Sequence, residues 1–307
     1  MLVKQKARYI LDLNAEERNE FLKSFDIVLS DCDGVIWMLA GPIPGAGHVI
    51  NLFLKAGKKY KLISNNSLRP DEEYLSLLAE MGVKDIGTND IVHPVKTIGR
   101  YLQKYKPGQP VYSMGCDIFN EYLRKSGIEV QTLESRDDWT FQLLSKSLQP
   151  VKPVGAVVFD LSLNMTYAGL VHAQQHLKKN PNTDFIVGAT DEHAPVSKDL
   201  VVIGPSGFIQ LLKENTGKEP IVLGKPGPLL GNFLKEHFQI KDPKRAIFFG
   251  DALQQDIKFG ISCGFQTLLM LSGATTKQQM LALPEELKPD YYANGIEDLK
   301  ALFEQQK

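Results

Sequence analysis

Four short segments of the chain carry residue types that could together transfer a phosphoryl group. They are Asp31-Cys32-Asp33-Gly34, Ser64-Asn65-Asn66, Gly224-Lys225-Pro226 and Gly250-Asp251, with Asp256 five residues later. Each segment follows, or lies close to, a short apolar run that is typical of a buried strand. Because ligands bind at the carboxyl ends of the strands in an open parallel sheet, we expect the fold to bring these segments together.

The first segment supplies the reacting groups. Asp31 is the candidate nucleophile, since a carboxylate can attack phosphorus to form an aspartyl-phosphate and so divide one difficult displacement into two. Asp33 is the candidate general acid and base, which protonates the leaving oxygen and then deprotonates the attacking water. That role requires a raised pKa at Asp33 beside other carboxylates. Gly34 allows a sharp turn without a side chain that would crowd the phosphate.

So many carboxylates beside a phosphate dianion require a cation. Asp31, Asp251 and the backbone carbonyl of Asp33 form an all-oxygen ligand set that suits Mg²⁺. We expect Asp256 to support this set rather than join it. Lys225 is expected to neutralise charge on Asp31 and the phosphate.

Further polar groups are candidates for binding the phosphate or the substrate. The Ser64 hydroxyl and the amides of Asn65 and Asn66 can donate hydrogen bonds to phosphoryl oxygens. His193, in a polar segment, could contact the substrate, and a solvated loop histidine is the alternative interpretation. Taken singly, Asp-x-Asp-Gly and Ser-Asn-Asn are also typical of simple turns. Their joint occurrence, in order and at strand ends, favours the catalytic interpretation.

Strand and helix patterns alternate along the chain. Strand-like runs lie at 27–29, 60–64, 111–114, 156–159, 185–187, 221–223, 246–249 and 267–270, and helical patterns at 118–125, 168–179, 228–238 and 254–262. This alternation predicts an α/β fold, with a parallel sheet covered by helices on both faces. The pattern begins again after about residue 98. We therefore predict a core formed by residues 1–97 and 215–307, with a second α/β domain inserted at 98–214.

Composition excludes several classes of function. The 307 residues are enough for two folded units, and 43% apolar with 23% charged residues is ordinary for a soluble protein. A formal net charge of −1 gives no electrostatic argument for binding nucleic acid or an anionic membrane. No apolar run approaches the roughly 20 residues of a membrane span. Three widely spaced cysteines suggest free thiols in a reducing compartment, so we expect a cytoplasmic location.

At these residues the chain resembles the haloacid dehalogenase superfamily of Mg²⁺-dependent phosphatases. More narrowly, it is similar to the para-nitrophenyl phosphatase group, which includes phosphoglycolate phosphatase and pyridoxal phosphate phosphatase. The likeness rests on residues 31–37, 42–46, 63–67, 223–228 and 249–251, and extends from about residue 20 to 303. It implies a Rossmann-like core with a large inserted α/β cap domain. It also implies Asp31 as nucleophile, Asp33 as general acid and base, Ser64 and Lys225 on the phosphate, and Asp251 on the metal.

The chain departs from this family's pattern in three places. Where relatives read G-D-R-L-x-T-D, this chain has Ala252 and Gln255 in place of the Arg and Thr. In the cap, residues 162–167 lack the Asp and His of the corresponding family segment, and residues 203–207 depart from P-G-T-G-S. Another cap segment, residues 189–195, keeps the family's Ala-Thr-Asp start. Substrate preference therefore does not follow from any one relative.

We accordingly expect a Mg²⁺-dependent phosphatase that hydrolyses small phosphomonoesters through an aspartyl-phosphate. Phosphoglycolate, pyridoxal phosphate and para-nitrophenyl phosphate represent the expected substrate type. The resemblance also implies a homodimer paired through the caps. Two alternatives remain: a phosphotransferase with the same fold, and a binding protein of weak or absent activity, which the altered residues Ala252 and Gln255 suggest.

Overall fold

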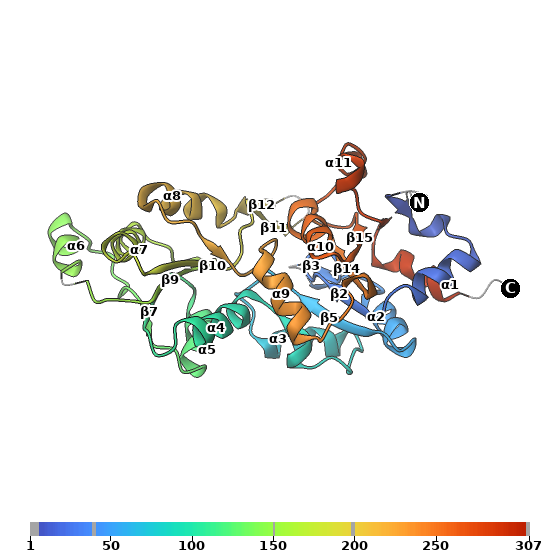
Figure 1. Ribbon diagram of the computed structural model, residues 1–307, viewed down its shortest axis with the longest axis horizontal. Helices are drawn as coiled ribbons and strands as arrows, with labels where there is room; N and C mark the ends of the chain where they lie inside the picture. Colours follow the sequence, from blue (N-terminus) through green and yellow to red (C-terminus); the bar gives the residue numbers. More distant parts are fainter. Residues whose placement is uncertain (1–5, 39–40, 150, 198–199, 305–307) are drawn as a thin grey trace.

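Two α/β units lie side by side along the long axis of the molecule (Figure 1). The computed structural model describes residues 6–38, 41–149, 151–197 and 200–304. The larger unit contains both ends of the described chain, and the smaller unit is formed by its middle part, drawn in green to gold. Within the described residues, no helix combines the length and the apolar character that a membrane span would need.

A seven-stranded parallel sheet forms the centre of the larger unit. Its spatial order is β1 (Arg8–Tyr9), β16 (Tyr291–Ala293), β15 (Gln266–Met270), β14 (Ala246–Gly250), β2 (Ile27–Ser30), β5 (Lys59–Ile63) and β6 (Ile91–Val92). From β2 the chain adds β5 and β6 on one side, whereas β14, β15 and β16 lie on the other. The strand order therefore reverses between β2 and β14. This is the switch point at which open α/β sheets bind ligands.

Helices cover both faces of this sheet. They are α1 (Ala15–Lys23), α2 (Ala46–Lys55), α3 (Asp71–Glu80), α9 (Pro228–His237), α10 (Lys258–Cys263) and α11 (Lys277–Leu281). Because both faces are covered, β2 and β14 are buried at every residue. In β14, Ile247 and Phe249 pack into one core cluster, and Ala246 and Phe248 into the cluster on the opposite face. This is the two-residue period of a strand.

A second parallel sheet forms the smaller unit. Its spatial order is β13 (Ile221–Val222), β10 (Asp184–Val187), β9 (Ala156–Phe159), β7 (Val111–Ser113) and β8 (Val130–Gln131). Around it lie α4 (Pro94–Tyr105), α5 (Asp117–Lys125), α6 (Phe141–Ser147), α7 (Tyr167–Lys179) and α8 (Ser206–Thr216). Strands β11 (His193–Ser197) and β12 (Leu200–Ile203) form a separate antiparallel pair, as do β3 (Trp37–Met38) and β4 (Gly41–Pro42).

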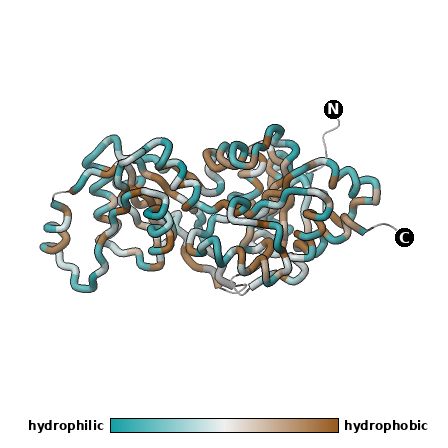
Figure 2. The backbone as a smooth tube through the Cα atoms, turned by 90° about the horizontal axis from the view of Figure 1, so that it is seen from below, coloured by the Kyte–Doolittle hydropathy of each residue, from teal (hydrophilic) through white to brown (hydrophobic). Residues whose placement is uncertain are grey.

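Each unit has its own hydrophobic core, and Figure 2 shows hydrophobic segments within both. Val95, Ile98 and Leu102 of α4 pack with the smaller sheet. Strand β13 also joins that sheet, with Ile221 opposite Ile186, although we assigned residues from 215 onward to the core. A two-residue strand carries no signal for the sheet that it joins, so this assignment was wrong for β13. The division into core and inserted cap at 98–214 otherwise stays a prediction.

Candidate active site

The two central strands of the larger sheet end at carboxylates. Asp31 follows β2 and Asp251 follows β14, and the Asp31 backbone N–H donates to the Phe249 carbonyl at 2.8 Å. With Asp256, these residues form a cluster in which one carboxylate oxygen of each lies within 4.8 Å of the others. All three side chains are buried. Residues 220 positions apart in the chain thus meet because their strands are neighbours at the switch point.

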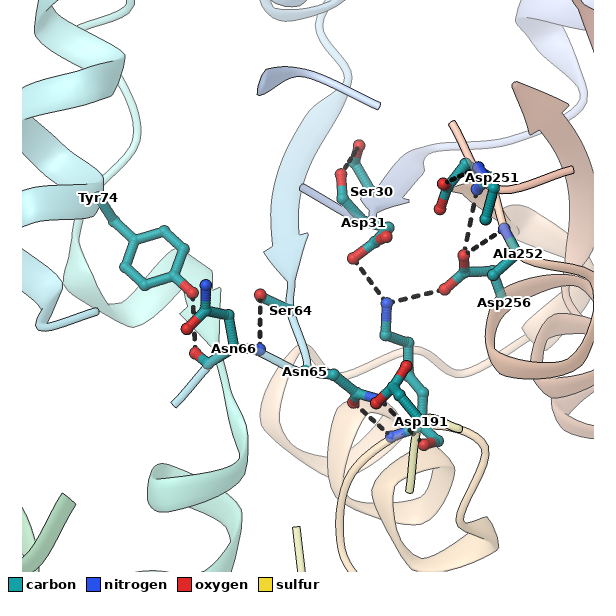
Figure 3. Close-up of polar contacts among 12 residues, drawn as sticks. Ser30, Asp31, Ser64, Asn65, Asn66, Tyr74, Asp191, Asp251, Ala252 and Asp256 are labelled. Carbon is teal, nitrogen blue, oxygen red and sulfur yellow. Dashed lines mark hydrogen bonds and ion pairs between the residues drawn. The ribbon is translucent and has the colours of Figure 1, made fainter. Parts of the chain in front are cut away.

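Lys225 joins this cluster from the segment that returns from the smaller unit. Its Nζ lies 2.6 Å from Asp31 Oδ1 and 2.7 Å from Asp256 Oδ1 (Figure 3). The lysine is 2% exposed. Burial acts to lower the pKa of Lys225, but the carboxylates of Asp256 and Asp31 outweigh it and raise that pKa above its ordinary value. Lys225 is therefore a permanent cation in contact with the candidate nucleophile.

Asp256 organises the loop that carries Asp251. Its Oδ2 accepts hydrogen bonds from the backbone N–H groups of Asp251 at 3.1 Å and Ala252 at 2.9 Å. The Asp251 side chain is in turn held by the backbone N–H of Ala274, which donates to its Oδ2 at 2.6 Å. The loop is thus supported by backbone donors, which do not depend on the side chain at position 252.

The three carboxylates carry more negative charge than one lysine can neutralise. Burial raises the pKa of Asp31 well above its usual range; Asp256 and Asp251 raise it further, and Lys225 opposes them. Burial and the neighbouring Asp256 raise the pKa of Asp251 to about 7. Each of these shifts shows that a second cation would stabilise the ionised site. The donors are buried carboxylate oxygens, which is the chemistry that Mg²⁺ prefers. The residues present therefore fit this ion.

Asp33 and Gly34 lie in the turn after Asp31. Burial raises the pKa of Asp33, while Arg69 and Lys225 act against this. Gly34 has a φ of +87°, and a Cβ added there would lie 2.4 Å from Asp251 Oδ2. Its carbonyl accepts a hydrogen bond from Ser272 Oγ at 2.7 Å. A glycine at position 34 therefore allows the turn that follows Asp31 to lie close to the Asp251 carboxylate.

The Ser64-Asn65-Asn66 segment follows β5, next to β2. Ser64 Oγ accepts from the Asn66 backbone N–H at 3.0 Å. The side-chain amide of Asn65 makes two hydrogen bonds to the backbone of Lys225. Its Oδ1 accepts from Lys225 N at 2.9 Å, and its Nδ2 donates to the Lys225 carbonyl at 3.1 Å (Figure 3). The Asn66 side chain accepts from Leu68 N at 2.9 Å. In this structure Asn65 therefore positions Lys225, whereas we had assigned it a phosphate contact.

Two acidic residues of the smaller unit also reach the core, and our sequence reasoning gave neither a role. Asp191 Oδ2 accepts from Asn65 Nδ2 at 3.0 Å (Figure 3). Asp160 is fully buried, and its Oδ2 accepts from Ser67 Oγ at 2.9 Å. Asp160 directly follows β9, just as Asp31 follows β2, so the pattern of an acid after a buried strand could have identified it.

Arg69 is another buried charge that sequence reasoning missed. Its Nε donates to Glu73 Oε1 at 2.8 Å, and its guanidinium lies over the rings of Trp37 and Tyr74 at 5.3 and 5.4 Å. Among the described residues its buried Nη1 has no hydrogen-bond partner. The nearby charge of Asp33 is one cause of the raised pKa of this arginine, after the Glu73 hydrogen bond. His193, by contrast, lies exposed in β11, opposite Ile203.

Comparisons with known proteins agree with this arrangement. A family model described as haloacid dehalogenase-like hydrolase matches residues 28–129, and a second model of the same kind, described as HAD-hydrolase-like, matches residues 222–299. Phosphoglycolate phosphatase 2 of Arabidopsis thaliana is 29% identical over 295 residues, which cover 95% of this chain and 98% of the relative.

Solved structures show the same fold. The p-nitrophenyl phosphatase of Archaeoglobus fulgidus is 25% identical, with a TM-score of 0.75 over 91% of this chain and 99% of that one. The glycerol phosphate phosphatase of Mycobacterium tuberculosis, solved in complex with magnesium, is 20% identical, with a TM-score of 0.72 over 91% of this chain and 77% of that one. With the two family models covering its core segments and phosphatases matching nearly its whole length, this chain belongs to the haloacid dehalogenase-like hydrolases.

Proposed function

We propose that this protein is a Mg²⁺-dependent phosphatase that hydrolyses small phosphomonoesters through an aspartyl-phosphate on Asp31. The observation that carries this proposal is the buried contact of Asp31 with Lys225, beside Asp251 and Asp256 at the switch point of the sheet. Family membership and the phosphatase names of the relatives support the same class of reaction.

The first half of the reaction transfers the phosphoryl group to the protein. An oxygen of Asp31 attacks phosphorus, and the bond from phosphorus to the leaving oxygen breaks. Asp33 gives its proton to that oxygen, and the raised pKa that burial produces at Asp33 favours the protonated form. Lys225 holds Asp31 in place and neutralises charge on the phosphoryl group.

The second half releases phosphate. Asp33, now ionised, takes a proton from a water molecule whose oxygen attacks phosphorus, and the bond from phosphorus to Asp31 breaks. Asp31, Asp251 and the Asp33 carbonyl would hold Mg²⁺, with Asp256 as support for the Asp251 loop. When bound, this ion neutralises the carboxylates and polarises the phosphoryl oxygens. Ser64 and Asn66 are the proposed hydrogen-bond donors to the phosphate.

The substrate is proposed to be a small phosphorylated metabolite. The relatives' names include phosphoglycolate and glycerol phosphate as substrates, and pyridoxal phosphate and para-nitrophenyl phosphate belong to the same size class. The smaller unit serves as a cap over the site, as its contacts from Asp160 to Ser67 and from Asp191 to Asn65 support. His193, an exposed residue of strand β11 in the cap, is proposed to contact the substrate.

Two further features belong to this proposal. A homodimer paired through the caps is supported by exposed apolar residues of the cap hairpin, Leu200, Val202 and Ile203, the last 76% exposed. A cytoplasmic location is supported by the three free cysteines, two of them buried.

Phosphate release from a panel of phosphomonoesters tests the function. The panel contains phosphoglycolate, glycerol phosphate, pyridoxal phosphate, phosphotyrosine and para-nitrophenyl phosphate, each with Mg²⁺ and with EDTA. We expect release from at least one compound, its loss in EDTA, and a decrease of several orders of magnitude for Asp31→Asn. Asp85→Asn, which removes an exposed carboxylate, is the matched control and keeps the activity.

The same assay separates the alternatives. A phosphorylated acceptor in place of free phosphate would identify a phosphotransferase. Substrate binding without any Asp31-dependent turnover would identify a binding protein. The backbone support of the Asp251 loop argues against the second alternative, because the hydrogen bonds from Asp251 and Ala252 to Asp256 do not need the family's Arg and Thr.

A further inference from the structure

The sheet of the smaller unit has a switch point of its own. The chain enters at β7, adds β8 on one side, and then adds β9, β10 and β13 in turn on the other side. All pairings in this sheet are parallel. The order thus reverses between β7 and β9, as in other doubly wound sheets that bind small molecules. The crevice beyond the carboxyl ends of β7 and β9 is therefore the expected place for a ligand.

The structure has a cavity at this place, with a volume of about 200 Å³. Its walls come from the segments after β7, β8 and β9, and none of the four catalytic segments contributes to them. Residues that matter for recognition include Asn120 of α5, Ser113 at the end of β7, Trp139 after β8, and Ser162 and Thr166 after β9. The cavity is smaller than the roughly 300–1,000 Å³ of sites for drug-sized ligands, so it suits a molecule of one or two rings.

Asn120 is the observation that indicates a ligand. Its side chain lines the cavity and is only 3% exposed. Its Nδ2 donates to the Gly115 carbonyl at 3.1 Å, but its buried Oδ1 has no hydrogen-bond partner among the described residues. An acceptor buried without a partner destabilises the folded chain, because it has lost its hydrogen bonds to water and gained none in return. A ligand that donates a hydrogen bond to Oδ1 would remove this cost.

The other walls define the rest of the ligand. Ser113 Oγ and Thr166 Oγ1 each accept from a backbone N–H at 3.1 Å, and a hydroxyl that accepts can still donate its own proton. The half-buried indole of Trp139 offers an aromatic surface. The ligand should therefore be planar and should carry both hydrogen-bond donors and acceptors on its edge.

The charges of the walls argue against a phosphate on this ligand. The lining residues, all within the described chain, include two exposed acids, Asp117 and Glu134, and a single cation, Arg136. Arg136 is already paired with Asp138, with Nε to Oδ1 at 2.7 Å and Nη2 to Oδ2 at 2.9 Å. Asp117 also stands in the first turn of α5, where it opposes a bound anion.

We infer that the cap holds a second binding site, at the β7–β9 switch point, for an uncharged nucleobase or its nucleoside. A nucleobase is planar and presents donors and acceptors along one edge, and an asparagine amide recognises such an edge through its oxygen and its N–H group. Asn120 Oδ1 accepts from the base, the hydroxyls of Ser113 and Thr166 donate to it, and Trp139 packs against its face. The site does not depend on the phosphatase chemistry of the core.

Tryptophan fluorescence tests this inference directly, since the chain has two tryptophans. Trp37 is fully buried in the larger core, and Trp139 lines the cavity. The full chain is titrated with adenine, adenosine, uracil and uridine, and with AMP for the effect of a phosphate. We expect a saturable change with at least one base or nucleoside, its absence in Trp139→Phe, and weaker binding of the corresponding monophosphate.

Two variants establish where the ligand binds. Asn120→Leu should weaken binding at least about tenfold by removing the acceptor, and Trp139→Ala should weaken it through the lost ring contact, both measured by calorimetry. Asn215→Leu, the same change at an exposed position of α8 outside the cavity, is the control. Circular dichroism checks that the variants fold. The inference is overturned if no base or nucleoside binds, if AMP changes the Trp139 fluorescence at lower concentrations than adenosine does, or if both site variants bind as the unmodified chain does. Binding is measured without turnover, so its failure is distinct from that of the phosphatase.

Discussion

Replacement of Lys225 by methionine is expected to destabilise the fold as well as abolish catalysis. Lys225 is 2% exposed, and its Nζ lies 2.6 Å from Asp31 and 2.7 Å from Asp256. At an effective dielectric constant of about 20, each contact corresponds to an attraction of about 6 kcal/mol. Desolvation of the three charges offsets most of this attraction. Methionine fills a similar volume but leaves the buried carboxylates without their cation.

Removing one partner of a buried ion pair typically costs about 3–5 kcal/mol, so we expect Lys225→Met to lower the free energy of unfolding by that amount. Urea denaturation at neutral pH with EDTA measures the change. The deficit should shrink as the pH falls, because protonation removes the charge of Asp31, whose pKa burial and neighbouring acids already raise. Mg²⁺ should also restore part of the stability, since a cation bound to the folded state again neutralises the carboxylates.

Lys61→Met provides the matched control. Lys61 lies on β5 of the same sheet and pairs with Asp90, but its side chain is 16% exposed and that of Asp90 is 23% exposed. Its loss should cost about 1 kcal/mol or less and should not respond to Mg²⁺. If the two variants were equally stable, Lys225 would not be the cation that stabilises this buried cluster, and our electrostatic description of the site would be wrong.

Three other changes follow from the structure. Gly34→Ala should lower activity and weaken its Mg²⁺ dependence, since the new Cβ would lie 2.4 Å from Asp251 Oδ2. A Mg²⁺ titration of activity measures this. Gly57→Ala is the control and should leave the titration unchanged, because Gly57 also has a positive φ but has open space around it. Burial lowers the pKa of His176 to about 4, so its neutral form stabilises the fold above pH 6.5, and this stability is lost as the pH falls toward 4. His176→Gln should flatten that part of a stability profile measured by urea denaturation, and an unchanged profile would contradict this account. Phe53→Ala should cost about 3–5 kcal/mol in thermal or urea unfolding, because the ring is fully buried in the larger core; a loss below 1 kcal/mol would show that the core closes around the gap.

Local patterns in the sequence predicted much of the fold. Asn14 and Glu17 have the spacing of a capping box and form one at the start of α1, with both reciprocal hydrogen bonds at 3.0 Å. The apolar runs at 156–159 and 246–249 are strands β9 and β14, and the helical pattern at 168–179 is α7. These elements were predictable because periodicity and capping are properties of neighbouring residues. Strands β1, β6 and β16 have only two or three residues each, and so were too short to give a pattern.

What each residue does in the site was harder to predict than which residues belong to the site. The sequence indicated that Asp31, Asp251 and Lys225 would meet, and the structure brings them into one buried cluster. It did not indicate that Asn65 would hold the Lys225 loop, because an amide in a turn can donate in several directions. The cap residue Asp191 contacts this same amide across 126 positions of the chain, a separation at which sequence spacing carries no information.

Local patterns in the chain established which reactive groups are available: carboxylates, a lysine and a glycine turn placed at the ends of buried strands. Which of these groups share one site depends on how the strands are ordered in the folded protein. Strand order set that outcome, since β2 and β14 are neighbours although more than 200 residues separate them, and β7 lies beside β9 in the cap. Strand order is not local, because pairing between parallel strands depends on long-range packing of helices on both faces. That packing also left the side-chain oxygen of Asn120 buried without a hydrogen-bond partner in the described part of the chain, which no local pattern predicts.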